Sequence, residues 1–498
     1  MTRLRLALCG ILAAVAGIAA GHLVAGFVSP AASPVLAIGS TVIDLTPTPV
    51  KEWAIATFGT ADKVVLQGSV LAGTLVLAAV AGLLTRRRMP VGVAVIMLLT
   101  ALAGAAALLR PAASPRDALP AAAATVVGVV VLVVLRRLAE APRVAPGGLA
   151  RRRFLGGAAG VAALSVLAAA GGQLRAGARA ARKLVLPRPA EAAAPLPRGL
   201  EATVPGISPL QTPTEKFYRI DTNLMVPQVD VETWQLEVDG MVERPFTMTF
   251  AELTAMPLVE RDITMTCVSN EVGGSYVGAA RWLGVRLTDL LDRAGVTGSP
   301  DQLLSTAVDG FTISTPLAAV RDGRDAMVAV GMNGAQLSDV HGFPARLVTP
   351  GLYGFVGATK WLTKLTLTTY AAQQAYWTKR QWATDAPVRT SARIDTPAPL
   401  STIRAGRVAI GGVAWAQHRG IGRVEVKVDD GAWQPTKLGP DVGVDYWRQW
   451  YLPWDAAPGL HRLSVRATDR QGRVQEAERA TPFPSGSSGI QEVVVTVT

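Results

Sequence analysis

Cys267 is the residue whose surroundings most clearly indicate chemistry. It follows Ile263-Thr264-Met265-Thr266, a plausible strand, and leads into a turn that contains Gly273-Gly274. A thiol at the end of a strand, facing a glycine-rich loop, is well placed to meet a bulky ligand. The alternative is a buried structural cysteine, which behaves as a small apolar side chain. This segment alone leaves both interpretations open.

Two familiar roles of a lone cysteine need partners that the sequence supplies only in part. A cysteine hydrolase needs a base beside the thiol, and the histidines outside the apolar first third are His341, His418 and His461. A zinc site needs a closed set of ligands, which one cysteine and scattered histidines do not form. A hydrolase that uses Cys267 and His341 stays an alternative, and zinc is not expected.

Two later segments have groups suited to a large anionic ligand. The run from His341 to Arg346 precedes a β-rich segment, and an arginine can grip a phosphate with two hydrogen bonds while a histidine adds a donor. The run from Pro350 to Trp361 combines glycines, including Gly357, with Thr359 and Lys360, so that backbone N–H groups can approach an anion closely. The first run is equally an exposed turn, and the second lacks the spacing of a P-loop.

The first third of the chain is expected to lie in a membrane. A hydrocarbon core of about 30 Å is crossed by about 20 apolar residues in a helix, and five stretches approach this length: roughly 4–28, 64–84, 90–109, 119–135 and 154–172. Residues 1–183 hold 19 Lys and Arg but only 5 Asp and Glu. The remainder is close to neutral, so the sequence pI of about 10.1 indicates membrane lipid rather than nucleic acid as the partner.

The arginines predict the orientation of these spans. Arg3, the triplet 86–88, Arg136, Arg137 and the triplet 151–153 fall on one side, while the opposite loops mix Lys and Arg with acidic residues. By the positive-inside rule the N-terminus is cytoplasmic, and an odd number of spans places everything after residue 172 on the extracytoplasmic face. This predicts a multi-pass protein of the cell membrane.

The last span carries a possible export signal. Arg151-Arg152-Arg153-Phe154-Leu155-Gly156 resembles a twin-arginine motif, and it is equally a plain cytoplasmic charge cluster. The span region has a single histidine, His22, whereas a b-type haem usually needs two axial side chains. The spans are therefore expected to anchor the chain or dock a partner.

The polar remainder of the chain divides into three parts that differ in composition and in hydrophobic pattern. Residues 173–213 are rich in Arg, Ala and Pro, which is typical of an extended tether. Residues 214–384 alternate strand-like and helix-like runs, such as 234–238 and 287–294, with a capping box at Thr249 and Glu252. Residues 385–498 read as short strands separated by turns, which suits a β-sandwich. The candidate strands there are 408–410, 424–428, 447–451, 463–467 and 493–497.

Together these motifs resemble the sulfite oxidase family of molybdenum enzymes over roughly residues 205–498. Thr266 to Gly274 resembles that family's molybdenum-ligand loop, and Ala280 to Gly295 resembles the helix that follows it. The runs 341–346 and 357–361 resemble its pterin-phosphate contacts, and Phe217-Tyr218-Arg219 its entry segment. The last domain is similar to the family's Ig-like dimerisation domain, through runs such as 411–415 and 421–426.

The resemblance implies a fold class and a set of site residues. The fold is a bundle of about five transmembrane helices (1–172), a linker (173–213), an α+β molybdopterin domain (214–384) and an all-β Ig-like sandwich (385–498). Cys267 is the implied ligand of Mo-molybdopterin and the catalytic residue. The implied cofactor contacts are Tyr218, Arg219, His341, Arg346, Gly357, Thr359 and Lys360.

The implied function is oxygen-atom or two-electron transfer with a small-molecule substrate. Asn270 and Glu271 stand where sulfite oxidases carry arginines, and Glu271 would repel a dianion if it faced the pocket, so an uncharged S-oxide or N-oxide is at least as plausible as sulfite. Electrons then pass through a separate redox partner, and a homodimer is compatible with the last domain. A receptor or scaffold with an Ig-like module is a second alternative.

Overall fold

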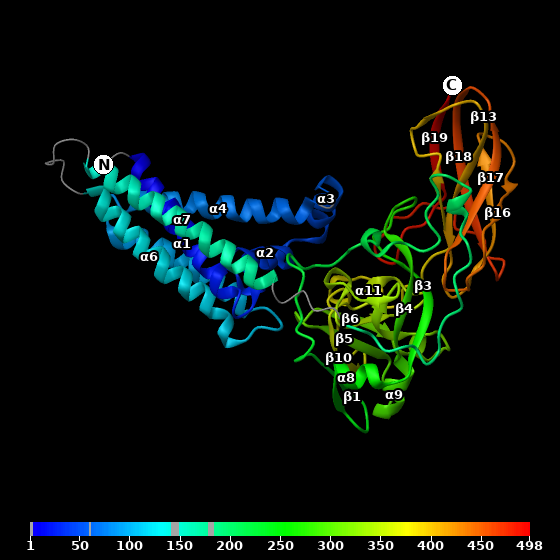
Figure 1. Cartoon of the computed structure of the whole chain (residues 1–498), viewed down its shortest axis with the longest axis horizontal. Helices are drawn as coiled ribbons and strands as arrows, with labels where there is room; N and C mark the ends of the chain where they lie inside the picture. The colour runs from blue at the N-terminus through cyan, green and yellow to red at the C-terminus, as the bar shows by residue number, and fades with distance from the viewer. Residues whose placement is uncertain (1–2, 59–60, 141–148, 178–183) are drawn as a thin grey trace. The chain divides into compact units, whose positions relative to one another are not determined.

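The computed structural model describes residues 3–58, 61–140, 149–177 and 184–498. The chain divides into two compact units, which are considered separately. The first is Met1–Arg182 with Thr222–Gln228, and the second is Lys183–Asp221 with Val229–Thr498 (Figure 1).

The first unit is helical. Five of its helices are long and apolar enough to cross a membrane: α1 (Arg3–Ala25), α4 (Asp62–Leu84), α5 (Met89–Leu108), α6 (Leu119–Glu140) and α7 (Leu149–Gly177). Each predicted apolar stretch falls on one of these helices. The prediction missed α2 (Pro34–Leu45) and α3 (Thr48–Phe58), which fill the segment between the first two spans. Neither has the length of a membrane span.

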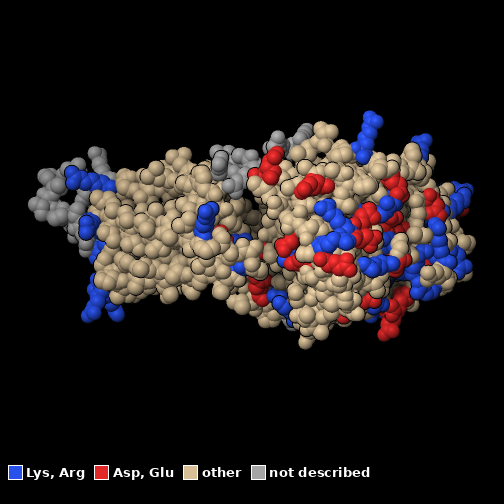
Figure 2. All heavy atoms as spheres, turned by 90° about the horizontal axis from the view of Figure 1, so that it is seen from below, with Lys and Arg blue, Asp and Glu red and all other residues tan. Residues whose placement is uncertain are grey.

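The helices of this unit approach one another closely where glycines meet. A Cβ atom added to Gly10 of α1 would lie 1.9 Å from the Ala78 carbonyl oxygen of α4, and one added to Gly82 would lie 2.1 Å from the Leu6 oxygen. Small residues drive helix association in lipid, where apolar burial between helices contributes little. In Figure 2 the visible face of the helices is largely free of charged side chains, and Lys and Arg gather near one end.

The centre of the second unit is built from two sheets. One has the strand order β2-β1-β10-β5-β6: Phe246–Thr249, Gln235–Gly240, Leu362–Thr368, Gln302–Ala307 and Thr312–Pro316. The other has the order β3-β4-β7-β8, with β9 beside β7: Leu258–Thr266, Val277–Arg286, Met327–Met332, Ala335–Gln336 and Arg346–Val348. The α-helices of this region are α8 (Phe250–Ala255), α9 (Leu287–Ala294), α10 (Leu317–Arg321) and α11 (Gly354–Gly357).

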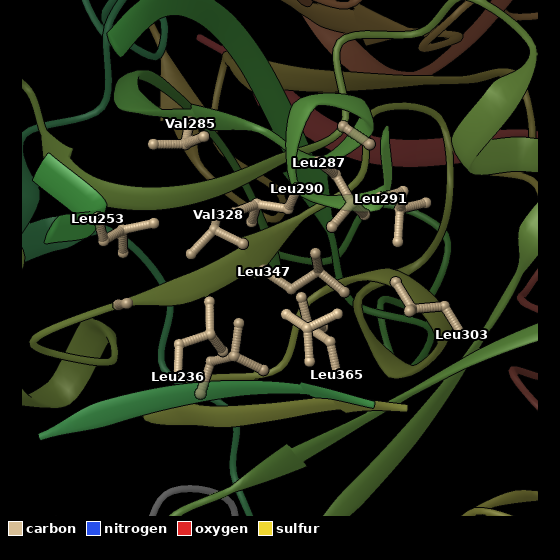
Figure 3. Close-up of a cluster of buried hydrophobic side chains, with 14 of the residues drawn as sticks. Leu236, Leu253, Val285, Leu287, Leu290, Leu291, Leu303, Val328, Leu347 and Leu365 are labelled. Carbon is tan, nitrogen blue, oxygen red and sulfur yellow. The ribbon is translucent and has the colours of Figure 1, made fainter. Parts of the chain in front are cut away.

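A leucine-rich core fills the space between these sheets. Leu236 and Leu365 come from the first sheet, Val328 and Leu347 from the second, and Leu290 from α9 (Figure 3). Each is at most 1% exposed. Because side chains alternate along a strand, Leu347 enters this core while its neighbours Arg346 and Val348 point to the other face of the sheet.

The segment that was expected to form one helix from Ala280 is divided in the structure. Residues Val277–Arg286 form strand β4, and only Leu287–Ala294 are helical, ending at Gly295 with φ +68°. The expectation was wrong for residues 280–286. β4 lies between β3 and β7 and is buried on both faces, so its sequence lacks the polar alternation of a half-exposed strand.

The C-terminal region is all β and packs two sheets over one core. One sheet has the order β11-β13-β17-β16: Ser391–Thr396, Gly406–Trp415, Arg448–Ala456 and Lys437–Leu438. The other has the order β12-β19-β18-β14-β15: Thr402–Ile403, Gln491–Val497, Gly459–Asp469, Ile421–Val428 and Gln434–Pro435. Ile410 and Trp450 from the first sheet meet Val465 and Val495 from the second, and all four are fully buried.

The expected linker begins inside α7, which continues to Gly177, and its residues 184–213 are largely extended and bound to the second unit. The Ala190 N–H donates to the Leu258 oxygen at 2.8 Å, and the Thr212 N–H donates to the Ala279 oxygen at 2.8 Å. Glu191 forms ion pairs with Arg261 and Arg286. From residue 184 onward the segment is therefore a strap on the second unit and not a free tether.

Candidate functional site

Cys267 lies where strand β3 ends. Ile263 and Met265 point to the face of the sheet that carries Phe217 and Trp282, and Cys267 continues this alternation. Its side chain is buried, and its N–H donates to the Tyr276 oxygen at 2.9 Å. Burial raises the pKa of the thiol, and hydrogen bonds from Ser269 act in the opposite direction. Without a metal or a cation beside it, this cysteine is a weak nucleophile.

The loop after Cys267 is closed by its own hydrogen bonds. The Asn270 side-chain oxygen accepts from the Tyr276 N–H at 2.8 Å, and the Gly274 N–H donates to the Glu271 oxygen at 2.8 Å. Asn270 is therefore a buried structural residue of the loop, and Glu271 is exposed. The Asn270 side-chain oxygen is therefore engaged within the loop.

Arg346 begins strand β9 and points to the same face of the sheet as Met265. Its Nη1 donates to the His341 oxygen at 3.1 Å, and its guanidinium lies 5.1 Å from the centre of the Trp282 ring. Its Nε atom is buried and has no hydrogen-bond partner among the described residues. Burial lowers the pKa of this arginine to about 10. A desolvated guanidinium with an unused donor is costly unless an anion meets it.

Lys360 provides a second buried cation. Its Nζ donates to Asp221 at 2.8 Å and to the Val340 oxygen at 3.2 Å, and it lies 4.5 Å from the centre of the Trp361 ring. Burial lowers its pKa to about 8, although the Asp221 carboxylate favours the charged form.

His341 is held as a neutral ring. Its Nε2 lies 2.9 Å from the Thr214 oxygen, and its ring meets Phe217 edge-on. Burial lowers its pKa to about 4. At neutral pH it is thus uncharged, with Nε2 donating to the carbonyl. Among the described residues, no hydrogen bond joins its ring to Cys267.

The segment Phe217-Tyr218-Arg219 packs on the face of the sheet that carries Trp282. Tyr218 stacks on Phe217 with 5.1 Å between ring centres, and burial together with the nearby Cys267 raises its pKa. Arg219 pairs with Asp221 at 2.9 Å and is partly exposed. Asp221 therefore joins Arg219 and Lys360, a role that the sequence interpretation missed although this carboxylate stands two positions after Arg219.

The glycine-rich segment is closely packed, and the hydroxyl of its Thr359 is already hydrogen-bonded. A Cβ atom on Gly357 would lie 2.9 Å from the Cβ of Thr349, so glycine is needed for this close approach. The Thr359 hydroxyl is buried and bonded to Ser305 at 2.6 Å. This bond fixes the segment before Lys360. A ligand would therefore contact Thr359 through an atom other than the hydroxyl oxygen.

Tyr353 is a further buried residue that the sequence interpretation left unassigned. It precedes α11, and burial raises its pKa to about 12, with the Cys267 charge acting in the same direction. The sequence could have indicated Tyr353 through its place in the same glycine-rich run as Gly357. The Tyr353 hydroxyl accepts from the Arg389 N–H at 3.4 Å and stays protonated at any ordinary pH.

These residues fit an anionic cofactor that is bound through a soft sulfur ligand. Arg346, Lys360 and Arg219 are three cations, and Asp221 is the one carboxylate that pairs with any of them in the described structure. The unused Nε donor of Arg346 and the low pKa values of both buried cations favour a bound phosphate. A thiolate suits a thiophilic metal such as molybdenum. Groups of three or more His, Cys, Asp or Glu that could hold a metal by themselves are absent from the described residues.

Comparisons with known proteins agree with this chemistry. Residues 223–377 match the family model described as the oxidoreductase molybdopterin binding domain. Human mitochondrial sulfite oxidase is 28% identical over 318 residues, covering 53% of this chain and 57% of the relative. A rice NADH nitrate reductase is 27% identical, covering 50% of this chain and 34% of the relative. The chain thus spans about a third to a half, or slightly more, of the length of these curated relatives.

A solved structure supports the fold. The crystal structure of the sulfane dehydrogenase SoxCD from Paracoccus pantotrophus superposes with a TM-score of 0.52 at 24% identity, covering 59% of this chain and 84% of that chain. At this identity the likeness concerns the fold.

Proposed function

Because the chain belongs to the sulfite oxidase family of molybdopterin-dependent oxidoreductases, we propose that it transfers an oxygen atom or two electrons to or from a small molecule at a Mo-molybdopterin centre. Cys267 would be the metal ligand and the catalytic residue. The cofactor would supply the redox chemistry, while the protein binds it, orients it and excludes water. The single observation that carries this proposal is a pair of buried cations: Arg346, which lies over Trp282 on the face of the sheet that Cys267 faces, and Lys360, whose charge acts on the Cys267 thiol.

The remaining roles follow from the contacts of each side chain. Arg346 and Lys360 would hold the pterin phosphate, with the His341 carbonyl oxygen holding the Arg346 guanidinium. Gly357 and Thr359 would shape the approach to Lys360. Tyr218 and Arg219 would form the opposite wall. A cofactor-free hydrolase is less well supported, because His341 is bonded to Thr214 and has a pKa of about 4, so that it is a poor base for a buried thiol.

The substrate is proposed to be a small molecule that lacks a double negative charge. Asn270 and Glu271 stand where sulfite oxidases carry arginines, so neither position adds a cation for a dianion, and a neutral S-oxide or N-oxide is at least as plausible as sulfite. Sulfite remains the competing substrate, and a panel that measures both oxidation of sulfite and reduction of neutral oxides decides between them.

We further propose a location and partners. The five apolar helices would anchor the protein in the cell membrane with the catalytic unit on the extracytoplasmic face, in accord with the arginine distribution. The arginine triplet 151–153 would serve twin-arginine export. The C-terminal sheets would be an Ig-like module that can support a homodimer, and electrons would pass through a separate redox protein.

The decisive experiment combines metal analysis with one substitution. Purified protein should contain about one molybdenum and one pterin per chain, and Cys267→Ser should reduce turnover by at least about a thousandfold, because the ligand to the reacting metal is changed. Cys9→Ser is the matched control, since Cys9 is the other cysteine and lies in α1. Absence of molybdenum and pterin from the wild type would contradict the proposal and favour a receptor, a scaffold or a hydrolase.

A further inference from the structure

Strand β3, which ends just before Cys267, has a second face that contacts the C-terminal region. Thr264 and Thr266 alternate with the residues that face the cofactor side. The Thr264 N–H donates to the Asp445 oxygen at 2.9 Å, and its hydroxyl accepts from the Trp447 N–H at 2.8 Å. The Thr266 hydroxyl accepts from Gln417 at 2.8 Å. The residue before Cys267 is therefore fixed from the C-terminal region.

The loop after Cys267 is held from the same region. The Ser487 hydroxyl donates to the Asn270 oxygen at 2.6 Å, and both residues are buried. Arg393 of β11 donates to the Gly274 oxygen at 2.8 Å. Arg393 is itself held by Asp395 at 2.6 Å and by Ser208 at 2.9 Å, so its guanidinium is a rigid donor.

At Gly273, the middle of the loop packs directly against Gln491 of β19. Gly273 has φ +82°, and a Cβ atom there would lie 2.6 Å from the Gln491 side-chain nitrogen. The Gln491 oxygen in turn accepts from the Ile394 N–H at 2.6 Å. The C-terminal region thus contacts the Cys267 segment before, within and at the end of its loop.

We propose that Ser487 and Arg393 are positioning residues that set the place of the Cys267 sulfur, so that the C-terminal region is a working part of the catalytic site in addition to any role in assembly. The proposal rests on the proposed function, in which Cys267 is the metal ligand. Cys267 lies between Thr266 and Asn270, and both are held by C-terminal side chains. Groups that orient a metal ligand tune the metal almost as strongly as the ligand itself.

The first test needs no cofactor. In the full chain produced without molybdenum cofactor, Ser487→Ala and Arg393→Met should increase the rate of Cys267 alkylation by about tenfold, because local opening of a loop exposes a buried thiol. Peptide mass analysis separates Cys267 from Cys9. Ser464→Ala and Arg466→Met are matched controls, since both side chains lie on β18 and bond to Glu492 and Glu425 within the C-terminal sheets.

The second test uses the molybdenum-loaded protein. Ser487→Ala should keep its molybdenum content and its KM within about twofold, while kcat falls by about 10- to 100-fold and the Mo(V) electron paramagnetic resonance signal shifts. Ser487→Thr, which retains the hydroxyl, should restore the signal. Unchanged alkylation and unchanged spectra in both the Ser487 and Arg393 variants would overturn the proposal.

These tests separate the two claims. Wild-type protein without molybdenum would overturn the proposed function, while the alkylation rates would still decide whether the C-terminal region holds the loop. If Ser487→Ala does not fold, the proposal is tested by comparing the alkylation rate and the spectrum of Arg393→Met with those of Arg466→Met.

Discussion

The two units of the chain differ in the polar groups that they bury. In the helical unit the buried hydroxyls have partners within that unit: Thr85 donates to the Gly82 oxygen at 2.6 Å, Ser165 donates to the Val161 oxygen at 2.7 Å, and Ser33 lies 3.2 Å from the His22 Nδ1 atom. In the second unit Arg346 is equally buried but keeps an unused donor. The buried hydroxyls of the helical unit are thus satisfied by neighbouring residues, whereas the centre of the second unit buries a cation that keeps a donor for a ligand.

The largest effect is expected where the unused donor is removed. Arg346→Met should reduce cofactor retention by about 2–5 kcal/mol of binding free energy, because the bound phosphate would lose a buried charge partner. The cofactor-free variant should be as stable as the wild type or more stable by about 1 kcal/mol, because an unpaired buried charge is gone.

Pterin content after gel filtration and thermal unfolding of the cofactor-free chain measure the two effects of this change. Arg244→Met is the control, since Arg244 is exposed and pairs loosely with Glu243 at 3.8 Å. Loss of stability without loss of cofactor would break the contrast between the two units.

A smaller effect, of a different kind, is expected in the helical unit. Gly82→Leu should destabilise the helices by about 1–3 kcal/mol, because its side chain would overlap the Leu6 backbone. Thermal unfolding in detergent measures this, and the molybdenum content and turnover of folded protein should not change. Gly73→Leu on the same helix is the control, since a Cβ atom there meets nothing within 4 Å. Equal damage from both would show that close packing at Gly82 is unimportant.

The smallest effect is a pH dependence at Lys360. Its pKa is about 8 in the cofactor-free protein, so the ammonium form predominates below that pH and the neutral form above it. Affinity for the anionic cofactor should therefore fall by about tenfold between pH 7 and pH 9. Lys360→Arg keeps its charge in this range and should flatten the dependence. Parallel pH curves for the two proteins would exclude Lys360 as the titrating contact.

Much of the local structure was predictable from the sequence. The five apolar helices were located within several residues, because length and hydropathy are properties of each segment alone. The Thr249–Glu252 capping box and the stop at Gly295 were also found as predicted. Such signals depend on neighbours along the chain, which the sequence contains in full.

The misses share a physical cause. Residues 280–286 of β4 were assigned to a helix through the family resemblance, and a strand buried on both faces has no alternating pattern that would have identified it. Asp221 and Tyr353 were left without a role, because their partners Lys360 and Arg389 lie far along the chain. Asn270 stands where sulfite oxidases carry an arginine, and only the closed loop reveals its bond to the Tyr276 N–H.

The sequence by itself determined which chemical groups are present and where the chain can cross a membrane, because residue identity and local hydropathy need no fold. Only the tertiary structure decided that Arg346 and Lys360 are buried, since strand alternation and the crossing of distant segments set the directions of their side chains. It also decided that Ser487 and Arg393 reach the Cys267 loop, because hydrogen bonds between residues so far apart in the chain form only after the sheets have packed.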